Sequence, residues 1–174
     1  MPPYTFTDRY PPEYEVTRRV VELLRADVTL CSSVVGSEGL MYQLTPRLMV
    51  GDDRVYSAYV ELPENSQLRS ALPRIHVETR QDEFMTEQID AAVPAASVTI
   101  WVNTIVPADR EQLGEQIDAR LRVVLMSTGL TSARILASGI TVDAERRQKV
   151  REAALGGVWR ITSVFRSRLV GVLQ

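Results

Sequence analysis

The stretch "SVTIWVNTIVPADREQLGEQIDARLRVVL", from Ser97 to Leu125, changes its hydrophobic period across one proline. Before Pro107, β-branched residues alternate as they do in a strand, and apolar residues on both faces predict that both faces are covered. After Pro107, apolar residues recur every three or four positions, which is typical of an amphipathic helix. The apolar stripe of this predicted helix consists of Leu113, Ile117, Leu121, Val124 and Leu125. A strand that leads directly into a helix is therefore the core of the predicted fold.

The polar residues of the same stretch predict the boundaries and the exposed side of the helix. Asp109, with Gln112 three residues later, resembles a capping box, so we expect the helix to begin there. Gly129 is a typical stop just beyond the last turn. Asp118 and Arg122 lie one helical turn apart, which predicts an ion pair on the outer side of the helix.

On the N-terminal side, residues 1–12 hold four prolines and predict an extended arm. Residues 13–30 predict a second amphipathic helix, with Pro12 well placed at its first turn. The apolar positions of that helix are Val16, Val20, Leu23, Leu24, Val28 and Leu30. A short strand is expected at 40–46, and residues 47–72 predict an inserted loop or a hairpin that turns at 51–53.

On the C-terminal side, alternating patterns predict strands at 133–146 and 157–172, in addition to one at 74–81 that precedes the opening stretch. The resulting order is α-β-β-β-α-β-β. We therefore expect residues 1–174 to form a single α+β domain with two amphipathic helices on one face of a mainly antiparallel sheet.

The amino-acid composition and net charge argue against several classes of function. A net charge of −2 does not suit a dedicated nucleic-acid binder. Cys31 is the only cysteine, which excludes an internal disulfide and fits a reducing compartment. No signal peptide and no apolar stretch of membrane-spanning length are visible, so we expect the chain to be cytosolic when it is made.

Residues with catalytic chemistry are scarce. His76 is the only histidine and lies on the polar side of its predicted strand, so we expect a surface imidazole. Cys31 near a helix end is expected to be a packing thiol. One histidine and one cysteine cannot build a zinc site, and no phosphate-binding glycine loop is present. We expect no catalytic residue, no cofactor and no metal, and hence a protein that is not an enzyme.

One cluster has two open interpretations. Arg160, Arg166 and Arg168 share one parity of the last strand, opposite the apolar residues Trp159, Ile161, Phe165 and Leu169. The stripe is either a solvated strand face or an interface or channel face, where arginines pair with carboxylates of a neighbour. A DNA-gripping role is weaker, because three arginines on a net acidic chain release few counterions.

Four segments together carry a family resemblance: "VTRRVVELLRADVTLCSSVVG", "LPRIHVETRQDE", "VTIWVNTIVPADREQLGEQIDARLRVVLM" and "GGVWRITSVFRSRLVGV". In order and spacing they resemble the tail terminator proteins of long-tailed bacteriophages. The likeness covers most of the chain apart from residues 1–12 and 47–72.

The resemblance implies a homohexameric ring in the neck or tail of a virion, assembled in the host cytoplasm. Such a ring caps the tail tube protein, ends tail polymerisation and joins the tail to a head–tail connector or stopper protein. DNA passes through its lumen without sequence-specific binding, and no membrane is involved. Six copies at −2 each carry −12, which favours slippage of DNA. The alternatives are another neck component (head-completion, stopper or connector protein) or a small α+β ligand-binding domain or enzyme.

Overall fold

The computed structural model describes residues 12–43, 54–57, 72–84, 92–103, 107–128, 135–152 and 158–172. The elements in chain order are α1 (Pro12–Ala26), α2 (Val28–Cys31), β1 (Ser33–Val34), β2 (Ser37–Glu38), β3 (Val55–Tyr56), β4 (Arg74–Phe84), β5 (Ala92–Asn103), α4 (Pro107–Thr128), β6 (Ile135–Glu152) and β7 (Val158–Val172).

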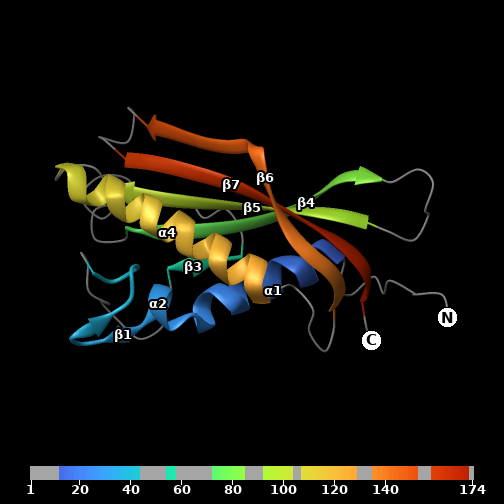
Figure 1. Cartoon of the computed structure of the whole chain (residues 1–174), viewed down its shortest axis with the longest axis horizontal. Coiled ribbons are helices and arrows are strands. Elements are labelled where there is room, and N and C mark those ends of the chain that lie inside the picture. Colours follow the sequence, from blue (N-terminus) through green and yellow to red (C-terminus); the bar gives the residue numbers. More distant parts are fainter. Residues whose placement is uncertain are drawn as a thin grey trace.

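Five strands form one sheet in the order β3-β4-β5-β7-β6. All neighbours in it are antiparallel except β3, which pairs with β4 in parallel. Helices α1 and α4 lie side by side across one face of this sheet, while the β1–β2 hairpin lies apart from it beside α2 (Figure 1). The predicted α+β class, with two helices on one face of a mainly antiparallel sheet, is confirmed.

The core lies between the two long helices and the sheet. Ile75 on β4 and Ile161 on β7 are both paired with position 100 of the strand between them, so Ile75 and Ile161 lie on the same side of the sheet, the side that faces the helices. Ile75 and Ile161 are buried, as is the whole predicted apolar stripe of α4. Fully burying one such side chain contributes on the order of 1.5–3 kcal/mol. This packing fixes which face of every strand remains on the helix-free side.

The first helical segment is broken where the sequence predicts continuity. Asp27 is extended (φ −76°, ψ 111°) between α1 and α2 and makes no side-chain cap. Its carboxylate instead accepts two hydrogen bonds of 2.8 Å from Arg120 on α4. The break turns Val28 outward, where it is 74% exposed. The expectation that Val28 belongs to the apolar stripe is therefore wrong.

Helix α4 begins at Pro107 rather than at Asp109, so the predicted capping box is wrong. Proline is favoured in the first turn because its missing N–H has no partner there in any helix, and its fixed φ suits helical backbone. Asp109 consequently lies inside the first turn. The predicted stop at Gly129 lies outside the described residues, and α4 is described to Thr128.

The strand expected at 40–46 is also wrong over its described part, since residues 40–43 form a turn in which Met41 and Tyr42 are buried. Of segment 47–72, the structure describes 54–57 and residue 72. The arm at 1–11 and the turn at 51–53 lie outside the described residues. Within 54–57, the buried Arg54 has a positive φ of 52° and donates a 2.8 Å hydrogen bond to the Met41 carbonyl.

Candidate functional site

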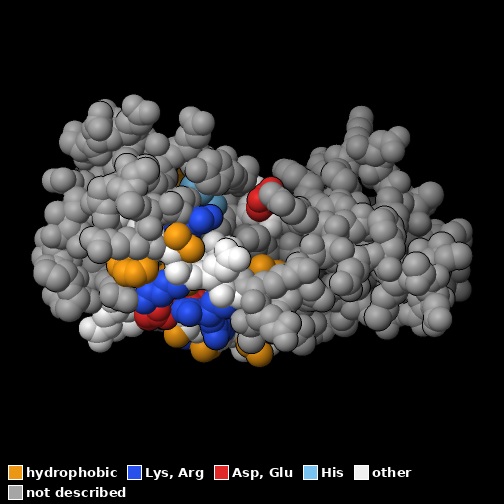
Figure 2. Space-filling model, turned by 90° about the horizontal axis from the view of Figure 1, so that it is seen from above, with side chains coloured by type: hydrophobic (Ala, Val, Ile, Leu, Met, Phe, Trp, Pro, Cys, Tyr) orange, Lys and Arg blue, Asp and Glu red, His pale blue; other side chains and the backbone are white. Residues whose placement is uncertain are grey.

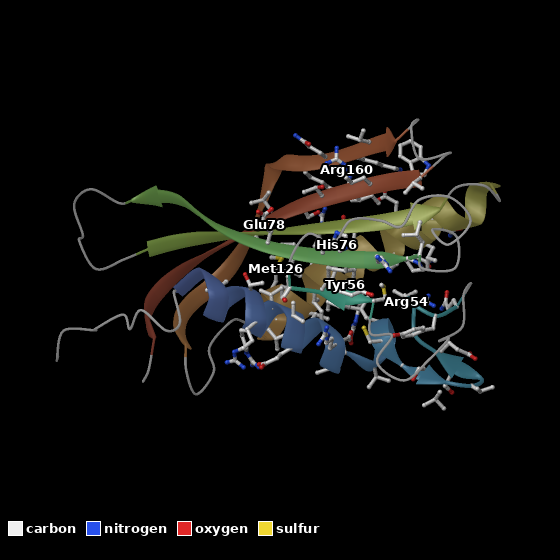
Figure 3. All side chains as sticks on the ribbon, turned by 180° about the vertical axis from the view of Figure 1, so that it is seen from behind. Arg54, Tyr56, His76, Glu78, Met126 and Arg160 are labelled. Atoms are coloured by element: carbon white, nitrogen blue, oxygen red, sulfur yellow. The ribbon has the colours of Figure 1, made fainter. Side chains whose placement is uncertain are left out.

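The arginine stripe lies on β7, an inner strand of the sheet between β5 and β6. Ile161, Ser163 and Phe165 of β7 are buried under the helices, so Arg160 belongs to the helix-free face (Figure 3). Arg160 is half-buried and stands opposite Trp101 and Val150. Any contact that this stripe makes with another molecule therefore uses the face of the sheet and not an edge.

The side chains of Arg166 and Arg168 lie outside those that the structure describes. Their backbone continues β7, and Arg166 pairs with Ala95 and Thr141. Trp101 stands opposite both Arg160 and Arg74, which aligns the two arginine positions across three strands. That this arginine stripe forms an interface, and not a solvated face, stays a prediction.

A charged cluster that sequence reasoning did not predict joins α4 to the last two strands. Its centre is Asp118, which is 2% exposed. One carboxylate oxygen accepts hydrogen bonds from Arg122 at 2.8 Å and from Arg147 on β6 at 3.0 Å, and the other accepts one from Ser163 on β7 at 2.6 Å. The predicted pair of Asp118 and Arg122 is thus present, but its position on the outer side of the helix is wrong.

The cluster extends along the outer edge of α4 through Glu115. Arg147 also donates to Glu115 at 2.6 Å, and Lys149 lies 2.9 Å from the same carboxylate. Burial lowers the pKa of Arg147, but its hydrogen bond to Asp118 and the charges of Asp118 and Glu115 outweigh this, so the pKa is raised. Arg147 is therefore a permanent cation that bridges β6 and α4.

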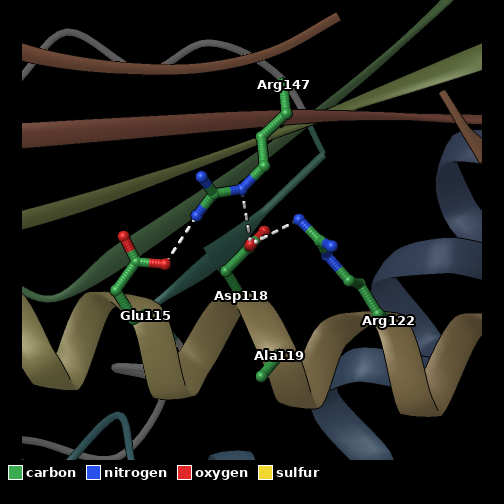
Figure 4. Close-up of a pocket in the computed structure, with 5 residues that line it drawn as sticks. All are labelled: Glu115, Asp118, Ala119, Arg122 and Arg147. Atoms are coloured by element: carbon green, nitrogen blue, oxygen red, sulfur yellow. Dashed lines mark hydrogen bonds and ion pairs between the residues drawn. The ribbon is translucent and has the colours of Figure 1, made fainter. Parts of the chain in front are cut away.

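These side chains surround a shallow pocket of about 320 Å³, lined by Glu115, Asp118, Ala119, Arg122 and Arg147 (Figure 4). Because Asp118 accepts hydrogen bonds from two guanidinium groups and a hydroxyl, its charge is already compensated within the chain. The arrangement can clamp a helix onto a sheet. It offers no base or nucleophile beside an unoccupied reaction centre.

His76 is a second correction. It is 3% exposed on the helix-free side of β4, where a surface imidazole was expected. The ring of Tyr56 on β3 lies edge-on to the His76 ring (Figure 3), with the two ring centroids 5.8 Å apart. The Arg74 guanidinium lies 5.1 Å from the centroid of the Tyr56 ring. Burial and the charge of Arg74 lower the pKa of His76 to about 4. A neutral imidazole packed into this corner is suited to a structural role.

Outside these clusters, the described residues include few side chains that could react or bind a metal. Cys31, the only cysteine of the sequence, is half-buried and packs against the core at the end of α2. No group of three or more potential metal ligands occurs among the residues described. In the same residues, no helix combines the length and the apolar character needed to cross a membrane.

Known proteins match this chain in fold but not in sequence. No protein-family model matches the chain, and no curated protein sequence does. The fold is similar to that of a chain in a solved structure described as "Virion of native gene transfer agent (GTA) particle", with a TM-score of 0.55 and 18% sequence identity. The match covers 88% of this chain and 92% of the other. The two chains therefore share a fold over nearly their whole lengths.

Proposed function

We propose that this chain is a structural virion protein that acts as a tail terminator, forming a hexameric ring on the tail tube and joining it to the head connector. The observation that carries the proposal is the shared fold with a chain of a gene transfer agent virion, over 88% of this chain. Because the match also spans 92% of the other chain, the likeness concerns most of both chains and not one motif.

The sequence resemblance to tail terminators supports the same proposal independently of the fold comparison. The two agree on a virion component, and the resemblance adds the position at the end of the tail. A ring requires a heterologous interface that closes by rotation, with two different surfaces on each subunit. The sheet face that carries the half-buried Arg160 and the outer surface of helix α4 lie on opposite sides of the subunit, which is compatible with that requirement.

The proposed role is structural and involves no catalysis. In the described part of the chain, Asp118 is held in ion pairs with Arg122 and Arg147 and in a hydrogen bond with Ser163. The buried His76 is neutral at physiological pH. The partners we propose are a second copy of the chain, the tail tube protein and the head–tail connector or stopper protein.

The experiment is to mix the purified, gold-labelled chain with tail tubes of the same virus and to image them by electron microscopy. A terminator labels one end of each tube and stops further growth when free tube protein is added. Label that binds only isolated head connectors would support a different neck component, and label on neither would contradict the proposal. A chain with denatured structure is the control for non-specific adsorption.

A further inference from the structure

Between Gln112 and Ser127 of α4, the four charged residues all form ion pairs with neighbouring elements of the chain or with each other. Glu115, Asp118 and Arg122 form the cluster with β6 and β7 on one flank of the helix. Arg120 binds Asp27 on the other flank. None of these four side chains lies on the outermost line of the helix, because positions 115, 118 and 122 are rotated toward β6 and position 120 toward α1.

From Gln112 to Met126, the outermost line of the helix is consequently uncharged. It consists of Gln112, Gln116, Ala119, Val123 and Met126, which we call the neutral stripe. These positions follow the spacing i, i+4, i+7, i+11 and i+14, so they form one continuous line of roughly 21 Å on the helix surface. Val123 and Met126, at its C-terminal end, are each 54% exposed. An outer helix face normally carries charge, so an exposed face without it indicates a contact surface.

The β1–β2 hairpin projects from the rest of the protein (Figure 1), and two exposed valines at its tip form a second apolar surface. Val34 is 64% exposed and Val35 is 92% exposed. The tip turns at Gly36, whose φ of +82° favours glycine, and Glu38 accepts a 3.0 Å hydrogen bond from the Gly36 N–H.

The base of this hairpin is fixed to α2. The main chain donates from Gly39 to Ser32 at 2.8 Å and from Leu40 to Thr29 at 2.9 Å. A Cβ at Gly39 would lie only 2.5 Å from the Leu30 carbonyl oxygen, which shows how closely the two segments approach. The two tip valines are therefore held in water by ordered backbone, which is unfavourable for an isolated subunit.

We propose that the hairpin tip of one subunit docks on the C-terminal half of the neutral stripe of a second copy of this chain. The inference rests on the proposed ring and assigns the two surfaces that close it. Val34 and Val35 would cover Val123 and Met126. The contact is heterologous, because each subunit supplies a hairpin on one side and a helix on the other, and such contacts build rings.

Charge complementarity selects this occupant. The exposed Glu38 stands at the base of the hairpin turn, and its hydrogen bond to the Gly36 N–H lowers its pKa, so it is ionised at neutral pH. Arg120 and Arg122 flank the stripe on either side of Val123. Arg120 binds Asp27 and Arg122 binds Asp118, yet about a third of each arginine side chain stays exposed beside the stripe. Basic and apolar side chains adjoin along the lower edge of the molecule in the view from above (Figure 2). Pairing of α4 with α4 would close as a dimer and leave the valine tip uncovered.

Disulfide trapping tests the contact. With Cys31→Ser as background, Val35→Cys and Met126→Cys are made singly and together. Under mild oxidation the doubly substituted chain should give a ladder of covalent species up to the hexamer, while each single-cysteine chain stays monomeric. Covalent dimers of the Met126→Cys chain alone would indicate helix pairing, dimers of the Val35→Cys chain alone would indicate hairpin pairing, and an internal disulfide would place the tip on its own helix. Each of these results contradicts the proposal.

A charge substitution gives an independent readout. Val35→Asp should weaken self-association at least roughly tenfold, because it removes one buried valine from every contact. Val28→Asp, at an exposed valine outside both surfaces, is the matched control and should leave association unchanged. Light scattering on the unmodified chain separates the two proposals. An oligomer without the disulfide ladder contradicts this contact alone, whereas a chain that is monomeric at every concentration contradicts both the contact and the ring.

Discussion

Removal of the Asp118 carboxylate should be among the most damaging single changes in the described part of the chain. Asp118→Ala leaves Arg147, Arg122 and the Ser163 hydroxyl without the acceptor that they share. Breaking a buried ion pair by removing one partner typically costs about 3–5 kcal/mol. The two arginine side chains are 28% and 35% exposed and can regain water, so we expect roughly 2–3 kcal/mol here.

Urea unfolding followed by circular dichroism measures this cost. With an m value of roughly 2 kcal/mol/M, the expected loss lowers the unfolding midpoint by about 1 M or slightly more. Glu115→Gln is the matched control in the same cluster, because Glu115 is 42% exposed and its loss should cost less than about 1 kcal/mol. All samples are compared at one protein concentration, so that any self-association affects them equally.

Ionic strength distinguishes the two carboxylates further. The pairs of Glu115 should weaken as salt is raised, while those of the buried Asp118 should change little, because buried pairs are screened less. If Asp118→Ala unfolds within about 0.5 kcal/mol of the unmodified chain, the cluster is not the clamp between α4 and the sheet that its geometry indicates.

Three further predictions follow from single features. His76 is the only histidine, so its NMR titration can be read directly and should show a midpoint near pH 4. The pKa of an unfolded histidine is near 6.5, so the stability that neutral His76 contributes is lost as the pH falls from about 6.5 to 4. A midpoint near pH 6.5 would refute the burial of His76. Gly39→Ala should lower the free energy of unfolding, measured by thermal denaturation, by up to about 3 kcal/mol, because the added Cβ meets the main chain of α2. Gly36→Ala should lower it by about 1 kcal/mol, because that Cβ enters open space and only the positive φ is unfavourable. Equal losses for the two variants would contradict the close approach at Gly39. Charge reversal at Arg160 and Arg166 together should impair assembly by electron microscopy while circular dichroism stays unchanged, and normal assembly would show that the stripe is a solvated face.

The periodicity of the sequence was sufficient to predict the sheet and the helix layer. Ile117 and Leu121 lie on a stripe that can be buried in only one way once the preceding strand joins the sheet. The prediction of their burial needed no partner residues. The same holds for β4 and β7, whose alternation matches the face that each presents to the helices.

Long-range polar contacts could not be predicted in this way. Asp118 has the pattern of an exposed helical residue, and its burial depends on Arg147, 29 residues later in the chain. Asp27 breaks a helix that local propensity would continue, because Arg120, 93 residues away, binds its carboxylate. His76 is covered at a corner where β3 pairs in parallel, and a two-residue strand gives no periodic signal.

The exposed surfaces show the same limit. The neutral stripe of α4 is visible in the sequence only after the flanking charges are known to bond sideways, since Glu115, Asp118 and Arg122 make the helix look charged throughout. The signal that could have revealed it is the run Gln112, Gln116, Ala119, Val123 and Met126 at helical spacing without a single charge.

The mass of the purified chain by light scattering, over a series of concentrations, tests the proposed ring most directly. One chain has a mass of 19.5 kDa, so six copies make about 117 kDa. We expect the sixfold species to form as the concentration rises, and Val35→Asp to shift its formation to higher concentration. A mass of 19.5 kDa at every concentration would contradict a ring built by this chain on its own.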